Sequence, residues 1–258
     1  NWGLQVSRFI FRKEELSYWQ AMNRRKQAIV SQFGALKSMQ PQNSNKVLDV
    51  MPYMVTRVEF FQKEPDNPFR QSGKINSVDA GLDAKIGLTN NLTLDLTVNP
   101  DFGQVEADPS VVNLSAHEIF FQEKRPFFVE GNNILTFKLK SSGGDLSSER
   151  LFYSRRIGRS PQGYPILEKG QYAEIRQFTR ILGAAKVSGK TKKGWSIGIL
   201  ESVTANEKTE VKGAGFSNSQ SIEPLTNYFI SRIEKEFNEG NTYVGGMITS
   251  VNRNIKND

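Results

Sequence analysis

The sequence has no cysteine and only one histidine among its 258 residues. Without cysteine, a disulfide framework, a thiolate metal site and a cysteine nucleophile are all excluded. Any serine-type triad would have to pass through His117, for which the simpler interpretation is a hydrogen-bonded loop histidine. We therefore expect a protein that is not an enzyme and that carries no cofactor.

Long hydrophobic runs are also missing. No apolar stretch approaches the roughly 18 residues that a membrane-spanning helix needs, so a helical membrane protein is excluded. The hydrophobic fraction of 37% is still compatible with a membrane β-barrel, because only alternate residues of its strands face lipid.

Positive charge is in excess, with a formal net charge of +7. The basic clusters, such as residues 24–26 and 190–193, fall in expected linkers and turns, and no recognition helix or aromatic RNA-binding motif accompanies them. We therefore expect no nucleic-acid partner. Basic turns of this kind favour an anionic lipid or lipopolysaccharide surface.

The most regular pattern that is present lies in residues 79–99, where apolar and polar side chains alternate on both sides of an Asn-Asn pair. This period of two predicts two strands joined by a hairpin. The apolar set is Ala80, Leu82, Ala84, Ile86, Leu88, Leu92, Leu94, Leu96 and Val98.

The alternation also predicts the register of this hairpin. The apolar set stays on one face if Leu88 lies opposite Leu92, which leaves a three-residue loop whose last residue, Asn91, would be left-handed. The same register sets Lys85 opposite Asp95, for which we predict an ion pair on the inner, polar wall.

Long strands with an apolar outer face and a polar inner face are typical of transmembrane β-barrels, although soluble antiparallel sheets also alternate. The side chains that we expect to face the membrane are Leu82, Ala84, Ile86, Leu94, Leu96 and Trp195. Trp195 lies beside a short turn, as expected of an aromatic belt at a membrane interface.

Further strands are expected over residues 47–60, 182–189, 195–204, 225–237 and 242–252. The tight turns then fall at one end, and the longer loops, residues 61–77, 100–181 and 205–224, at the other, which is typical of outer-membrane barrels. The predicted fold class is all-β, an antiparallel transmembrane β-barrel segment. The hairpin and the five further ranges give seven strands in all. Because bacterial single-chain barrels have an even number of strands, we expect this barrel to be incomplete.

The connection over residues 100–181 is too long for an ordinary loop, so we expect it to fold as an external cap, a plug or a rim element. Its paired phenylalanines could form a small core or a ligand platform, and its arginines would suit a sugar or an anionic ligand. The ligand or partner candidates are Phe127, Phe128, Arg155, Arg156 and Arg159.

The start of this insertion carries three carboxylates, Asp101, Glu106 and Asp108. Carboxylate oxygens are the ligands that Ca²⁺ prefers, so these residues are candidate metal ligands, although their spacing differs from an EF-hand loop. The alternative is that they cap turns beside proline.

Several strings in the chain resemble one family: NPDFGQVEADPSVVNL, EKRPFFVEG, LFYSRRIGRSP and ILGAAKVSGKTKKGWSIGIL. They look like the C-terminal domain of unknown function in large outer-membrane proteins of Gram-negative bacteria, which follows a carbohydrate-binding family 9-like module. The resemblance implies that residues 1–46 hold the last strand of that β-sandwich module plus a connector. Residues 47–258 would form the N-terminal part of the barrel, with the insertion at 100–181. No established reaction and no catalytic residue come with the resemblance.

We therefore predict a non-enzymatic β-barrel protein of the cell outer membrane, serving transport or the surface handling of glycans or proteins. Its partners would be outer-membrane lipid and glycans or other outer-membrane proteins. Two alternatives stay open: a soluble all-β carbohydrate-binding or carbohydrate-processing domain, and a structural subunit of a larger outer-membrane assembly.

Overall fold

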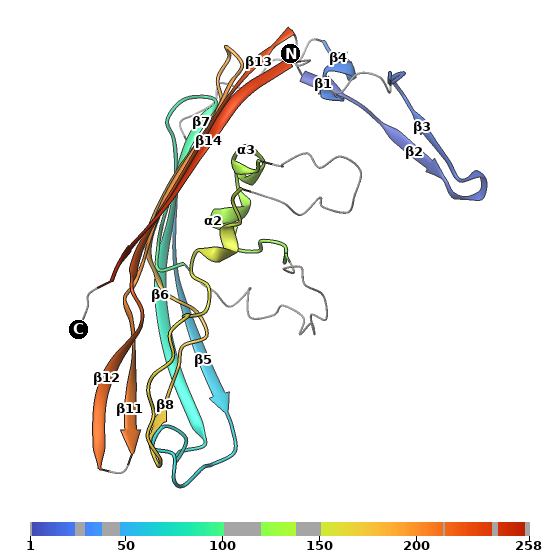
Figure 1. The fold of residues 1–258 in the computed structure, drawn as a ribbon. Helices are drawn as coiled ribbons and strands as arrows, with labels where there is room; N and C mark the ends of the chain where they lie inside the picture. The colour runs from blue at the N-terminus through green and yellow to red at the C-terminus, as the bar shows by residue number, and fades with distance from the viewer. Residues whose placement is uncertain are drawn as a thin grey trace.

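A computed structural model describes residues 2–23, 29–37, 47–100, 120–137, 151–213, 215–238 and 242–255. Its main element is a seven-stranded antiparallel sheet in the order β14-β13-β10-β9-β7-β6-β5, which curves along its length (Figure 1). The strands are β5 (Leu48–Phe60), β6 (Lys74–Gly87), β7 (Leu92–Val98), β9 (Ile181–Lys190), β10 (Trp195–Thr204), β13 (Leu225–Phe237) and β14 (Thr242–Asn254). The prediction of an all-β, mainly antiparallel fold is confirmed. Within the described residues the sheet is open, with β5 and β14 at its edges.

The register of the β6–β7 hairpin is the predicted one. Lys85 lies opposite Asp95 and Ile86 opposite Leu94, and the Leu88 amide donates to the Leu92 carbonyl over 2.9 Å. The predicted left-handed conformation of Asn91 is wrong, since its φ is not positive. The turn is held instead by the Thr89 hydroxyl, which accepts hydrogen bonds from the backbone amides of residues 91 and 92.

Two predicted loop boundaries are wrong. Strand β6 begins at Lys74, five residues earlier than the strict alternation suggested. Residues 205–224 contain two strands, β11 (Glu207–Gly213) and β12 (Phe216–Glu223), which form a separate three-stranded sheet with β8 (Tyr172–Ala173). Strand β11 alternates buried and exposed residues, but its buried set includes Glu207 and Thr209, so a pattern based on apolar residues misses it.

The N-terminal residues form short elements of their own. Strand β1 (Trp2–Leu4) pairs with β4 (Gly34–Leu36), and β2 (Ser7–Ile10) pairs with β3 (Glu15–Tyr18). The 3₁₀ turns are η1 (Phe11–Lys13) and η2 (Val30–Gln32). The stretch that we expected to be a connector therefore contains two strands, while its division from an upstream module stays a prediction.

The two faces of the large sheet differ in composition and in burial. The outer face carries the apolar set, and large side chains on it are exposed: Leu48 at 71%, Met54 at 72% and Ile248 at 68%. The inner face carries Asp83, Lys85, Asp95, Thr97, Lys186 and Ser188. The described insertion residues lie on the concave side, with the short helices α2 (Pro126–Val129) and α3 (Asn132–Leu135) (Figure 1). Among the described residues, no helix is long and apolar enough to span a membrane.

Candidate functional site: an insertion seated on the inner face of the sheet

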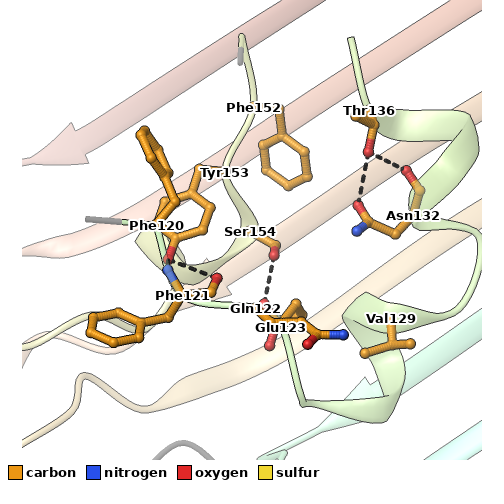
Figure 2. Close-up of a pocket in the computed structure, with 10 residues that line it drawn as sticks. All are labelled: Phe120, Phe121, Gln122, Glu123, Val129, Asn132, Thr136, Phe152, Tyr153 and Ser154. Atoms are coloured by element: carbon orange, nitrogen blue, oxygen red, sulfur yellow. Dashed lines mark hydrogen bonds between the residues drawn. The ribbon is translucent and has the colours of Figure 1, made fainter. Parts of the chain in front are cut away.

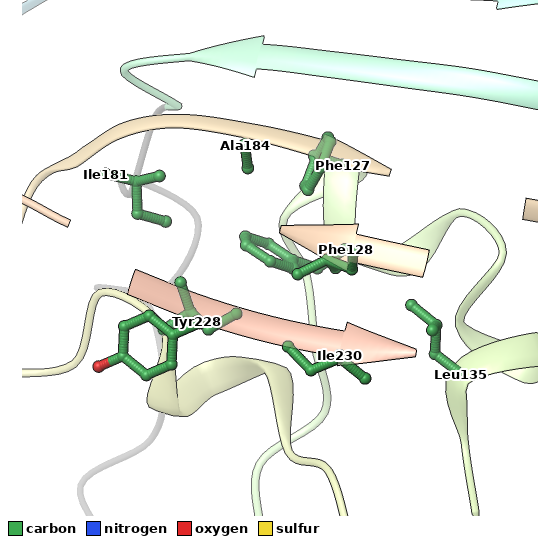
Figure 3. Packing of buried hydrophobic residues seen from close by; sticks show 9 residues of the cluster. Phe127, Phe128, Leu135, Ile181, Ala184, Tyr228 and Ile230 are labelled. Carbon is green, nitrogen blue, oxygen red and sulfur yellow. The ribbon is translucent and has the colours of Figure 1, made fainter. Parts of the chain in front are cut away.

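Residues 120–137, which we call the inner segment, pack against the inner face of the sheet. Phe127 and Phe128 from α2 and Leu135 from α3 meet apolar side chains of β9, β10 and β13 in one buried cluster (Figure 3). The cluster comprises Phe127, Phe128, Leu135, Ile157, Ile181, Ala184, Leu200, Tyr228 and Ile230. Phe127 and Phe128 thus form the predicted small core, and their burial leaves no platform for a ligand.

Two close approaches seat the inner segment. Gly131, between the two helices, has a left-handed φ of 66°, and a Cβ at this position would lie 2.6 Å from the Ser188 hydroxyl oxygen. On the sheet, a Cβ at Gly198 would lie 2.8 Å from a methyl carbon of Leu135. Since heavy atoms in van der Waals contact are about 3.5–4.0 Å apart, a larger side chain at either position would require Ser188 or Leu135 to shift. The segment and the sheet fit each other closely at both positions.

Lys186 on β9 is the main polar anchor of the inner segment. Its side chain is fully buried, and its ammonium donates hydrogen bonds to the backbone carbonyls of Phe127 and Glu130, the latter over 2.6 Å. The same ammonium lies 3.3 Å from Asp95 Oδ2 on the neighbouring strand β7. That oxygen accepts no well-aligned hydrogen bond from the described residues, and the Asp95 carboxylate balances the charge of the buried ammonium. Lys186 thereby ties the C-terminal end of α2 to the sheet.

The predicted ion pair between Lys85 and Asp95 is wrong, although the two residues lie opposite each other. Lys85 instead pairs with the carboxylate of Glu130 on the inner segment, and Asp95 pairs with Lys186. Sequence reasoning on one hairpin could not include the third strand or the insertion, which supply the partners that both charges use.

Arg232 on β13 is a third cationic anchor. Its guanidinium donates to the Ile134 carbonyl over 2.6 Å and lies 5.7 Å from the centre of the Phe137 ring. It is also paired with Glu234 on its own strand. The cations of β6, β9 and β13 therefore hold the inner segment across most of the width of the sheet.

Within the insertion, Arg125 holds the inner segment to residues 154–157. Its guanidinium forms a buried two-point ion pair with Glu123, at 2.8 and 2.9 Å, and donates to the carbonyls of Ser154 and Ile157. Burial by itself would raise the pKa of Glu123, but the hydrogen bonds and positive charge of Arg125, with a further hydrogen bond from Ser154, lower that pKa below its ordinary value. Glu123 is therefore held as a carboxylate.

A cavity of about 290 Å³ lies in this part of the insertion (Figure 2). Its lining includes the aromatic rings of Phe120, Phe121, Phe152 and Tyr153, together with polar groups of Glu123 and Asn132. The Tyr153 hydroxyl accepts a hydrogen bond from the backbone amide of Phe121 and donates one to its carbonyl. The Ser154 hydroxyl donates to the carboxylate of Glu123, so these polar groups already have partners. The Ser154 hydroxyl and the Glu123 carboxylate that accepts its hydrogen bond both line the cavity, and Glu123 is also held by its ion pair with Arg125.

The arginines predicted to bind a ligand do not form one cluster. Arg155 donates to the carbonyl of Gln122, and Arg159 forms a 2.9 Å ion pair with the buried Glu223 of β12. Arg156 lies in the 3₁₀ turn η3 (Ser154–Arg156) and is exposed. Arg155 and Arg159 thus hold parts of the insertion and β12 together.

The residues that we expected to face the membrane lie on the outer face. Leu82 and Trp195 are exposed, whereas Ala84, Ile86, Leu94 and Leu96 are half-buried among their neighbours. Lys235 lies over the Trp195 ring at 5.6 Å. Contact with lipid stays a prediction.

Other candidate chemistry has no support in the described residues. Asp101, Glu106, Asp108 and His117 fall outside them, and no group of three potential metal ligands occurs within them. The letters GWSIG at residues 194–198 fit the hydrolase pattern G-x-S-x-G, which serves catalysis at a strand-to-helix turn. Here Ser196 lies inside β10, paired on both sides with β9 and β13, so the serine is not presented on such a turn.

Residues 17–258 match the family described as Domain of unknown function (DUF5916). The chain belongs to this family. No curated protein and no solved structure matches the chain. The matched range includes the whole seven-stranded sheet and the inner segment, so the site described above lies within the DUF5916 domain.

The anchors of this DUF5916 domain were missed by sequence reasoning. Lys186 is the one charge among the small and apolar residues of ILGAAKVSG, on the polar face of its strand. A charged residue in such surroundings needs a buried partner, and this requirement could have indicated that Lys186 holds another part of the chain. Arg125 stands beside the paired aromatics of EKRPFFVEG, but the sequence did not indicate which groups it binds. Arg232 gave no local signal, because its partner lies 98 residues away.

Proposed function

We propose that this chain forms part of the wall of a β-barrel in the outer membrane, and that it is not an enzyme. The observation that carries the proposal is the outer face of the sheet. Large apolar side chains are exposed there on strands from one edge to the other, including Val50, Met54, Val78, Leu82 and Ile248. A soluble monomer rarely exposes an apolar surface this continuous, whereas lipid solvates it without penalty.

The inversion of polarity supports the same proposal. In a soluble protein the face beneath an insertion is apolar and the solvent face is polar. Here the covered inner face carries buried charges such as Lys186 and Asp95, and the uncovered face exposes many large apolar side chains. This distribution is typical of barrels with a polar interior.

Strand length also fits a membrane. The outermost strands β5 and β14 each have 13 residues. At about 3.3 Å per residue such a strand is roughly 43 Å long, and a tilt of about 45° leaves roughly 30 Å across the bilayer, which is the thickness of the hydrocarbon core.

The role that we propose is transport or surface handling of glycans or proteins, because the polar inner face under the insertion is the surface past which a hydrophilic molecule would move. The open edges of β5 and β14 would be closed by further strands, since unpaired backbone groups are too costly in lipid. The position after a carbohydrate-binding family 9-like module belongs to the same proposal.

The test is membrane partition of the full natural protein in a Gram-negative host. The proposal predicts that the protein fractionates with the outer membrane, needs detergent for extraction and migrates faster on gels before heating than after it. Recovery in buffer alone, with no heat-dependent shift, would instead support a soluble carbohydrate-binding domain. Co-purification at fixed stoichiometry with other membrane proteins would support the role of an assembly subunit.

A further inference from the structure

We infer that the inner segment is a displaceable plug, and that moving it opens a passage for small hydrophilic solutes along the inner face of the sheet. This inference rests on the proposed barrel and adds the gating element and the class of solute. The nearest alternative is a permanent filler that serves only to stabilise the sheet.

Beside the apolar cluster, the inner face of the sheet offers many groups that water can solvate. Polar side chains lie on it along neighbouring strands: Asp83, Lys85, Asp95, Thr97, Lys186, Ser188, Ser202, Arg232 and Glu234. Asp95 Oδ2 and the Ser202 hydroxyl are buried without a hydrogen-bond partner among the described groups. Water could satisfy both atoms once the wall is uncovered, whereas a permanent core is better built from apolar side chains.

The insertion is not part of the ladder that holds the sheet together. Strands β7 and β9 pair directly with each other, and the whole insertion leaves from the end of β7 and returns at the start of β9. Both attachments therefore lie at the same end of adjacent strands. The inner segment can leave the inner face without breaking a backbone hydrogen bond of the large sheet.

Water can replace the hydrogen bonds and ion pairs that hold the inner segment on the sheet. Lys186 and Arg232 hold backbone carbonyls, and the Lys85–Glu130 pair is partly exposed. Each of these groups would be solvated after release. Among the described residues, the apolar contact of the inner segment centres on the buried cluster around Phe127, Phe128 and Leu135.

The experiment measures the conductance of the full natural protein in planar lipid bilayers, with Lys186→Met as the releasing variant. Loss of hydrogen bonds from a charged group should raise the open probability by about ten- to a hundredfold over wild type. The matched control is Lys190→Met, because Lys190 lies on the same strand but pairs with Glu236 and not with the inner segment. Limited proteolysis within residues 120–137 reports release independently.

A reversible lock completes the test, since the chain has no cysteine of its own. Gly131→Cys with Ser188→Cys would place the two Cβ atoms 3.0 Å apart, within roughly 0.5 Å of disulfide geometry. In the Lys186→Met background, oxidation should return the conductance to the wild-type level and reduction should raise it again. In the wild-type background, the lock should abolish spontaneous openings.

Gly198→Val is a second variant that should release the inner segment, because the valine side chain would push against Leu135. This variant changes no charged residue. Gly246→Val is its control, since a Cβ at that position would meet no other described residue within 4 Å, its two chain neighbours apart. The inference is overturned if proteolysis shows release of the inner segment while conductance stays at the wild-type level. It is also overturned if the lock changes nothing in either background. A wild-type protein that does not enter the membrane would refute the proposed barrel itself.

Discussion

Single arginine substitutions at successive positions on the outer face of β6 should destabilise the protein to a degree that depends on the depth of each position in the membrane. Ile86, Leu82 and Val78 lie two, six and ten residues from Leu88, at the tight-turn end of this face. At about 3.3 Å per residue and a tilt of about 45°, their depths below that end are roughly 5, 14 and 23 Å. With an apolar band about 25 Å tall, only Leu82 lies near the midplane. The alternation by itself predicts that Ile86 lies near the midplane, whereas its distance from Leu88 along the strand places it close to one interface.

The expected magnitudes follow from these depths. Leu82→Arg should lower the free energy of unfolding by about 2–4 kcal/mol, and Ile86→Arg and Val78→Arg by about 0–1 kcal/mol each. The inner-face control is Asp79→Arg at an exposed position, which should change the free energy of unfolding by less than about 0.5 kcal/mol.

The assay is reversible urea unfolding of the full natural protein in lipid vesicles, followed by tryptophan fluorescence. The account requires a peak at the central position and low values on both sides. Three equal values, or a steady trend along the strand, would refute the membrane placement. A soluble sheet would show no dependence on depth.

Further predictions concern the inner segment. Gly131→Ala should destabilise its seating by about 2 kcal/mol, because the left-handed backbone and the nearby Ser188 both oppose a methyl group, and protease sensitivity would measure this against Gly246→Ala. Arg125→Met should cost about 3–5 kcal/mol in the same assay, because it leaves Glu123 buried and unpaired; an effect below about 1 kcal/mol would contradict the geometry. Because the pKa of Glu123 is lowered on folding, its contribution is complete above the ordinary value of 4.5 and is lost as pH falls through the folded pKa, so protease sensitivity should rise in acid and Glu123→Gln should flatten that dependence.

The sheet could be predicted from the sequence because its information is local. A period of two with large apolar residues fixes which face a residue occupies, and one hairpin with a short loop fixes its register. That is why Lys85 was placed correctly opposite Asp95. Strand β11 was not predicted, because its buried positions include Glu207 and Thr209, whose burial depends on partners elsewhere in the chain.

The candidate site could be predicted less well, because its contacts are long-range. Lys186 meets the carbonyl of Glu130 across 56 residues, and no local pattern encodes that approach. The fit of Gly131 against Ser188 is likewise visible only once the insertion is folded onto the sheet. The prediction of a left-handed Asn91 was wrong for a different reason. The Thr89 hydroxyl accepts hydrogen bonds from the backbone amides of residues 91 and 92, and these bonds hold the turn without a left-handed residue.

The most direct test of the central claim is lipid contact measured residue by residue on β6. The chain has no cysteine, so single cysteines labelled with a fluorophore can be placed at will. In vesicles with chain-brominated lipid, the full natural protein should show strong quenching at Ala80, Leu82 and Ala84, and little at Asp79 and Asp83 on the opposite face. Equal quenching on both faces, or none on either, would contradict a barrel wall whose outer face meets the membrane.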